Sequence, residues 1–187
     1  TRLLPCFITI SNIESRDVAQ VISGNERVVR PRLSDALFFW DQDLKQPLAA
    51  YADKLAQSTF QKDLGSIADK VERVRKLIAQ IVAALPKATT ELAALADRAA
   101  ALAKCDLVTK VVYEFPELQG LMGGYYATHG GEPDGVALAI REHYLPTQQG
   151  TPIPSSPAGQ LVSLADKLDS LAGIFAIGQK PTASKDP

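Results

Sequence analysis

The chain has 187 residues, of which 46% are hydrophobic and 22% charged, and its formal net charge is −1. This composition suits a globular chain with its own core and excludes an intrinsically disordered protein. Because the net charge is close to zero, a strong overall attraction to nucleic acid or membrane is excluded, and an RNA contact would need a local basic face. No apolar run approaches the roughly 20 residues that span a bilayer.

The first residues combine strand-like and helix-like patterns. The alternating, β-branched run Leu3–Ile10 predicts a strand. Ser15 and Gly24 are placed to begin and end a short helix, and residues 26–30 should be extended. Pro31 then favours the start of another helix, in which apolar residues recur at helical spacing.

That helical pattern is interrupted at Pro47, and a second helical stretch continues to about Gln57. Because a strand and several helices are mixed here, residues 1–62 are interpreted as a short α/β edge of a core domain. Residues 63–187 should form a separate, all-helical domain. The chain starts without Met and ends without a helix cap, so both ends resemble cuts within a longer protein.

The clearest helix begins at Ser66, which is followed three residues later by Asp69 in the pattern of a capping box. An apolar stripe continues from there to Pro86. Thr89 or Thr90 should cap the next helix, which is rich in alanine.

Three later helices are predicted over residues 117–127, 133–144 and 159–177, with a loop rich in Pro, Ser and Gly before the last one. Helical spacing predicts the buried face of the last helix, which comprises Leu161, Leu164, Ala165, Leu168, Leu171 and Ile174.

The residues that commonly carry chemistry are few. There are two histidines, and His129 lies in a Gly-rich turn, where an exposed side chain is expected. Cys6 and Cys105 lie far apart in apolar runs, which favours small buried thiols in a reducing compartment, with a disulfide as the alternative. The start lacks a signal peptide pattern, so we expect a cytoplasmic protein.

One set of residues has a recognisable order: Asp106, His143 and Asp166 fall on successive helical segments. This order resembles the HD superfamily of helical metal-dependent phosphohydrolases, whose histidines and aspartates hold metals that activate water. The doublet that defines the superfamily is Cys105-Asp106 here, and the helix after Ser66 has no histidine. The resemblance implies an HD-like fold with a degenerate metal site, and a working phosphohydrolase is the alternative hypothesis.

Six longer runs carry a more specific pattern. They are GNERV (24–28), RLSDALFFW (32–40), KCDLVTKVVYEFPELQG (104–120), MGGYY (122–126), ADKLD (165–169) and GIFAIGQ (173–179). Together they resemble the β subunit of the bacterial two-subunit glycyl-tRNA synthetase, and the similarity extends over essentially the whole chain.

That resemblance implies an α2β2 class II ligase in which the α subunit uses ATP and Mg to make glycyl-adenylate. The β subunit recruits and positions tRNA(Gly). It implies no catalytic residue, metal or cofactor in this chain, with the α subunit and tRNA as partners and no membrane.

The candidates for an RNA contact are Lys70, Arg73 and Lys76, which are three residues apart on one predicted helix. Asp69 and Glu72 lie between them, so a solvated face that pairs with itself is the alternative. A helical scaffold that only holds neighbouring domains is a third hypothesis for the chain.

Overall fold

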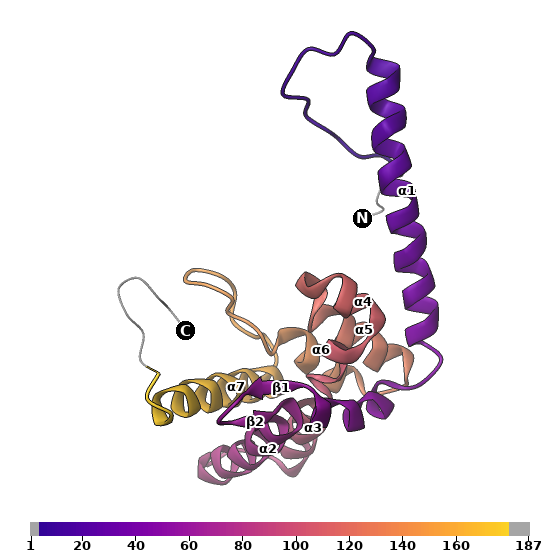
Figure 1. Ribbon diagram of the computed structural model, residues 1–187. Helices are drawn as coiled ribbons and strands as arrows, with labels where there is room; N and C mark the ends of the chain where they lie inside the picture. The colour runs from indigo at the N-terminus through magenta and orange to yellow at the C-terminus, as the bar shows by residue number, and fades with distance from the viewer. Residues whose placement is uncertain (1–3, 180–187) are drawn as a thin grey trace. The chain divides into compact units, whose positions relative to one another are not determined.

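The computed structural model describes residues 4–179 (Figure 1), which form two compact units. One unit ends at Asp41 and the other begins at Gln42. The division into domains at residues 62 and 63 stays a prediction. No helix within residues 4–179 is both long and apolar enough to cross a bilayer.

The first unit contains most of helix α1 (Val18–Asp43). The predicted break at Gly24 and the extended segment at 26–30 are wrong, because α1 continues through both and includes Pro31. A proline leaves the carbonyl four residues earlier without its helical donor. The residues around Pro31 are exposed, so water can satisfy that carbonyl and the helix can continue.

The strand predicted for Leu3–Ile10 is also wrong over residues 4–10, which have no regular secondary structure. Leu3 itself lies outside the described residues. A strand needs a partner to satisfy its backbone N–H and C=O groups, and the described part of this unit contains no other strand. The alternating pattern therefore had no partner strand to pair with.

The second unit confirms the prediction of a mainly α fold. After the end of α1 its elements are the 3₁₀ helix η1 (Leu48–Gln57), the strands β1 (Thr59–Gln61) and β2 (Gly65–Ser66), and helices α2 (Ile67–Ala84), α3 (Thr90–Leu102), η2 (Cys105–Val108), α4 (Lys110–Glu114), η3 (Pro116–Leu118), α5 (Leu121–His129), α6 (Asp134–Glu142) and α7 (Pro157–Ala176). The antiparallel pair β1–β2 was not predicted, and Gly65 enters its second strand with a φ of 87°.

The predicted starts of α2 and α3 are confirmed by their caps, whereas α5 and α7 begin at Leu121 and Pro157 and not at the predicted residues 117 and 159. The Ser66 hydroxyl accepts a hydrogen bond from the Asp69 amide at 3.2 Å, and the Asp69 carboxylate accepts one from the Ser66 amide at 2.7 Å. The Thr89 hydroxyl accepts from the Leu92 amide at the start of α3. These hydrogen bonds, reciprocal in the case of Ser66 and Asp69, satisfy donors that the first helical turn leaves free.

Helices α2, α3 and α7 contact one another, and α6 contacts α3, α5 and α7 (Figure 1). The predicted buried face of α7 is only partly right. Leu161 and Ala165 are buried, whereas the helix exposes three of the predicted residues, Leu164, Leu168 and Leu171. The neighbouring helices cover only part of the face of α7 on which its apolar residues lie. The covered part of α7 also includes two polar residues, Ser163 and Asp166, which are buried.

Asp43, the last residue of α1, is a buried carboxylate that joins two elements of the second unit, α4 and α5. Its side chain is almost inaccessible, and it accepts hydrogen bonds from the amides of Lys110 and Val111 at 2.9 Å each. It also accepts one from the Tyr126 hydroxyl at 2.9 Å. Asp43 thereby satisfies the first amides of α4 and attaches α5 to the same point.

We expect Asp43→Ala to lower the free energy of unfolding by about 3 kcal/mol, because two amides and a hydroxyl would lose a buried charged acceptor. Chemical denaturation measures the change. Asp41→Ala, two positions earlier and exposed, is the control and should change stability little. Equal losses in the two variants would contradict the anchoring role.

Glu142, the last residue of α6, plays a similar part at the start of α7. It accepts hydrogen bonds from the amide and hydroxyl groups of Ser155 and Ser156. The Ser156 hydroxyl in turn accepts from the Gly159 amide at 3.0 Å. Burial alone would raise the pKa of Glu142, but the four hydrogen bonds lower it below its usual value.

Because the folded-state pKa is depressed, the stabilisation by ionised Glu142 is present above the unfolded pKa and is lost as pH falls through the folded pKa. We therefore expect Glu142→Gln to lower the unfolding free energy by about 1–2 kcal/mol at pH 7, with the difference narrowing below about pH 4. Denaturation curves from pH 3 to 7 check this, with exposed Glu117→Gln as control. A pH-independent difference would contradict it.

Candidate functional site

Asp106 lies in η2 with its side chain completely buried. Its Oδ2 accepts hydrogen bonds from the amides of Gly120 at 2.6 Å and Gly123 at 3.0 Å. Its Oδ1 is buried and has no hydrogen-bond donor within the described residues. Burial raises the pKa of Asp106 to about 6, and the two amide hydrogen bonds oppose that increase.

The last residue of the run 104–120, Gly120, is required to be glycine by the backbone conformation and by its close neighbours. Its φ is 78°, a left-handed conformation that favours glycine. A Cβ at this position would lie 2.9 Å from the Tyr144 ring and 3.5 Å from Cε1 of His143. The missing side chain lets the backbone between η3 and α5 approach Asp106 and His143 together.

His143 follows α6 and is fully buried. Its Nδ1 lies 2.6 Å from the carbonyl oxygen of Ile140, and a carbonyl can only accept, so Nδ1 carries the hydrogen. The lone pair of Nε2 then faces the Lys104 ammonium, which donates to it at 3.0 Å. Burial, with Lys104 nearby, lowers the pKa of His143 to about 3, so the ring is neutral.

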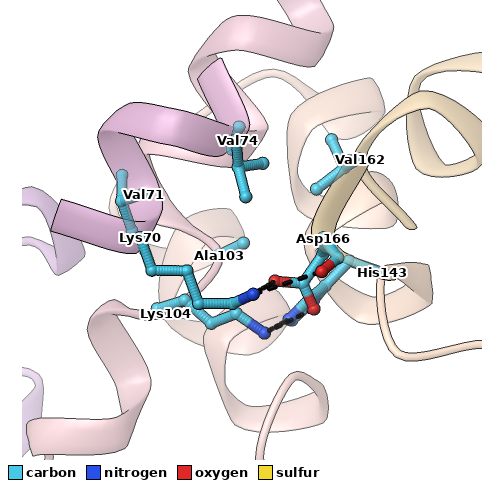
Figure 2. A pocket seen from close by; sticks show the side chains of 9 residues that line it. Lys70, Val71, Val74, Ala103, Lys104, His143, Val162 and Asp166 are labelled. Atoms are coloured by element: carbon cyan, nitrogen blue, oxygen red, sulfur yellow. Dashed lines mark hydrogen bonds and ion pairs between the residues drawn. The ribbon is translucent and has the colours of Figure 1, made fainter. Parts of the chain in front are cut away.

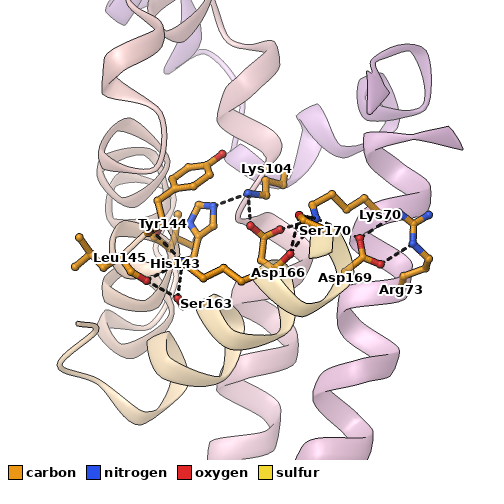
Figure 3. Close-up of polar contacts among 12 residues, drawn as sticks. Lys70, Arg73, Lys104, His143, Tyr144, Leu145, Ser163, Asp166, Asp169 and Ser170 are labelled. Carbon is orange, nitrogen blue, oxygen red and sulfur yellow. Dashed lines mark hydrogen bonds and ion pairs between the residues drawn. The ribbon is translucent and has the colours of Figure 1, made fainter. Parts of the chain in front are cut away.

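Lys104 is the centre of this arrangement (Figure 3). Besides His143, its Nζ donates to Oδ2 of Asp166 at 3.1 Å and lies 3.9 Å from the centre of the Tyr144 ring. Only 8% of its side chain is exposed. Burial lowers the pKa of Lys104, and the Asp166 carboxylate opposes that effect.

A second lysine approaches Asp166 from α2. The Nζ of Lys70 lies 3.2 Å from Oδ1 of Asp166 and 3.2 Å from Oδ2 of Asp169. It also donates to the Ser170 hydroxyl at 2.7 Å. Burial would raise the pKa of Asp166, but Lys104 and Lys70 lower it, so this carboxylate is ionised between two ammonium groups.

The structure brings His143 and Asp166 together and places Asp106 nearby, and the ammonium group of Lys104 contacts both His143 and Asp166, where an HD-type centre would require a metal ion. A small cavity of about 10 Å³, room for one water molecule, lies among Lys70, Lys104, His143 and Asp166 with valine and alanine side chains around it (Figure 2). Within residues 4–179 no three metal-ligating side chains are grouped to hold an ion.

Cys105 stands where the resemblance to the HD superfamily would place a histidine, and its thiol is not suited to bind a metal. Its thiol is buried, lies 3.6 Å from the Ala101 carbonyl oxygen, and has a pKa that burial raises to about 12. A thiol that remains protonated is a poor metal ligand and a poor nucleophile. The residues present therefore do not fit the metal that an HD-like fold implies.

Burial was predicted for both cysteines, and it is wrong for Cys6, which is exposed.

The exposure predicted for His129 is confirmed. Beside the buried cluster lies an open pocket of about 470 Å³, lined by Glu117, Gln119, Tyr144, Pro146, Thr147, Asp166 and Lys167. This pocket carries both charge signs, so it has no marked preference for an anion.

The three residues predicted to contact tRNA have different surroundings. Lys70 is buried against α7, and Arg73 makes a bidentate pair with Asp169, with its Nε 2.6 Å from Oδ1. Lys76 is exposed. The geometry gives Lys70 and Arg73 contacts that join α2 to α7, and the tRNA role of all three residues stays a prediction.

Sequence reasoning missed Lys104 and the pairing of Lys70 with Asp166. A lysine is usually a surface residue, and Lys70 lies on a helix face with other charges. The one signal at Lys104 is its place at the end of the apolar run Ala99–Ala103, directly before Cys105 and Asp106.

Comparison with known proteins places this mainly helical chain among subunits of aminoacyl-tRNA synthetases. The family model described as glycyl-tRNA synthetase beta subunit matches residues 1–187. The chain belongs to this family.

Two relatives, each named glycine–tRNA ligase beta subunit, show the extent of the similarity. That of Pseudomonas fluorescens (strain Pf0-1) is 54% identical over 186 residues, which cover 100% of this chain and 27% of the relative. That of Chromohalobacter salexigens is 53% identical over 185 residues, which cover 99% of this chain and 26% of the relative. The chain thus spans about a quarter of these proteins' length.

We expect Asp166→Asn to lower the free energy of unfolding by about 3 kcal/mol, because two buried ammonium groups would lose their shared negative charge. Thermal or chemical unfolding measures the change. The matched control is Asp97→Asn. The Asp97 side chain is 47% exposed, and its carboxylate is paired with Arg75. The control should cost less than about 1 kcal/mol, and an equal cost at the two positions would contradict the buried network.

Proposed function

We propose that this chain is part of the β subunit of a two-subunit glycyl-tRNA synthetase and acts there in positioning tRNA and in contacts between subunits. In this proposal the α subunit of an α2β2, class II enzyme carries out ATP- and Mg-dependent activation of glycine in the cytoplasm. The present chain supports transfer of glycine to tRNA(Gly) and contributes no catalytic residue. The family match over residues 1–187 is the observation that carries this proposal.

The interior of the helical unit supports a non-catalytic role. The site that resembles a phosphohydrolase centre holds Lys104 between His143 and Asp166, and both of these side chains are occupied by its ammonium group. The alternative function, hydrolysis of a phosphate ester by a bound metal, finds no support in this geometry. A buried network of charges instead gives the unit a defined shape on which an exposed surface can be displayed.

For the tRNA contact the proposal rests on the exposed side of α2. Lys70 and Arg73 are turned towards α7, so Lys76 is the predicted contact whose ammonium group can reach a phosphate without breaking a buried ion pair. Phosphate contacts by lysine displace counterions, and binding through such contacts weakens as salt concentration rises.

The test uses the complete enzyme with both subunits and tRNA(Gly). We expect Lys76→Ala to weaken tRNA binding and to reduce the slope of log Kd against log salt by about 1. The rate of glycyl-adenylate formation, measured by pyrophosphate exchange in the absence of tRNA, should not change.

Lys45→Ala, which removes an exposed lysine outside α2, is the matched control and should leave both measurements unchanged. If the two variants have the same salt slope as the unaltered enzyme, Lys76 has no phosphate contact. If the complete, unaltered enzyme does not attach glycine to tRNA(Gly), the proposed activity itself is refuted.

A further inference from the structure

We propose that Lys104 is an internal cation that takes the place of a metal ion, and that its ammonium group excludes divalent metals from the space beside Asp106, His143 and Asp166. This inference concerns the interior of the helical unit and does not depend on the proposed tRNA contact. In this proposal Lys104 keeps a metal out in addition to Cys105, whose protonated thiol is a poor ligand.

Lys104 contacts the types of atom that commonly bind a metal ion. A neutral imidazole nitrogen and a carboxylate oxygen are both common ligands of transition metals. His143 also donates its other ring N–H to the carbonyl of Ile140, which is how metal-bound histidines are usually oriented. Here the Nε2 lone pair and Oδ2 of Asp166 both point to the nitrogen of Lys104.

The contacts of Lys104 are too long for bonds to a metal ion. The Nζ of Lys104 lies 3.0 Å from Nε2 of His143 and 3.1 Å from Oδ2 of Asp166. Bonds from zinc to nitrogen or oxygen are about 2.0–2.2 Å long. The two side chains are therefore spaced for an ammonium group, and a metal could enter only after the ammonium left and the ligands moved inwards.

The charge of Lys104 also balances the carboxylates around it. Asp166 is paired with Lys104 and Lys70, and Asp169 is paired with Lys70 and Arg73. The remaining carboxylate is that of Asp106, whose buried Oδ1 has no hydrogen-bond donor within the described residues. Removing the charge of Lys104 would leave a net excess of negative charge there, which favours entry of a cation.

The central experiment compares Lys104→Met with Lys76→Met in the complete enzyme. Methionine keeps an unbranched side chain of similar length without the charge, and Lys76 is an exposed lysine on α2. Each protein is incubated with Co²⁺ or Zn²⁺, dialysed, and analysed for bound metal, for the visible spectrum of Co²⁺, and for its melting temperature.

We expect Lys104→Met to melt at a lower temperature and to take up about one more ion per β subunit than Lys76→Met, with the ion restoring part of the loss. A second change, His143→Ala, should abolish the uptake. The unaltered enzyme should melt at the same temperature with and without a chelator. The proposal is overturned if Lys104→Met folds and binds no more metal than Lys76→Met, or if a chelator removes an ion and destabilises the unaltered enzyme.

If Lys104→Met does not fold, a second pair of variants tests the same role of Lys104. The amide oxygen of His143→Gln can accept the hydrogen bond from Lys104, whereas His143→Leu offers no acceptor. If Lys104 is the cation, the Gln variant should melt at a higher temperature than the Leu variant, with no change in metal content. A metal centre would lose its ion in both variants, and equal melting temperatures would refute the role of Lys104.

Discussion

The second unit depends on one buried carboxylate, Asp166, which is held between the ammonium groups of Lys70 and Lys104. These lysines come from α2 and from the segment between α3 and η2, so the contact ties two separate parts of the chain to α7. Burying a charge is costly unless it is paired and hydrogen-bonded, and removing one partner leaves the others uncompensated. The helices can therefore pack in this register and not in one that separates the charges.

The same constraint determines what the site can do chemically. A neutral His143 and an ionised Asp166 face each other across a cation that belongs to the protein. The cation cannot exchange, lower the pKa of a bound water or change its coordination, which are the properties that make a metal useful in hydrolysis. The positive charge at this position therefore belongs to the buried core of the second unit.

Sequence patterns were most reliable where the interactions are local. The capping box of Ser66 and Asp69, the start of α3 at Thr89 and the extent of α2 were all predicted, because each depends on residues a few positions apart. The errors at residues 4–10 and along α1 have the opposite cause. A strand depends on a partner elsewhere in the chain, and a proline in an exposed helix is tolerated because water is available.

By itself, the sequence determined the mainly helical class of the chain, the caps of α2 and α3, and its family resemblance. The tertiary structure alone decided that Lys104 and Lys70 face inwards and that three leucines of α7 face outwards. Hydrophobicity and spacing describe each helix separately, whereas the partner of a buried charge is chosen by packing between helices. Lys70 and Asp166 are 96 residues apart in sequence, so their contact follows from the fold and from no local pattern.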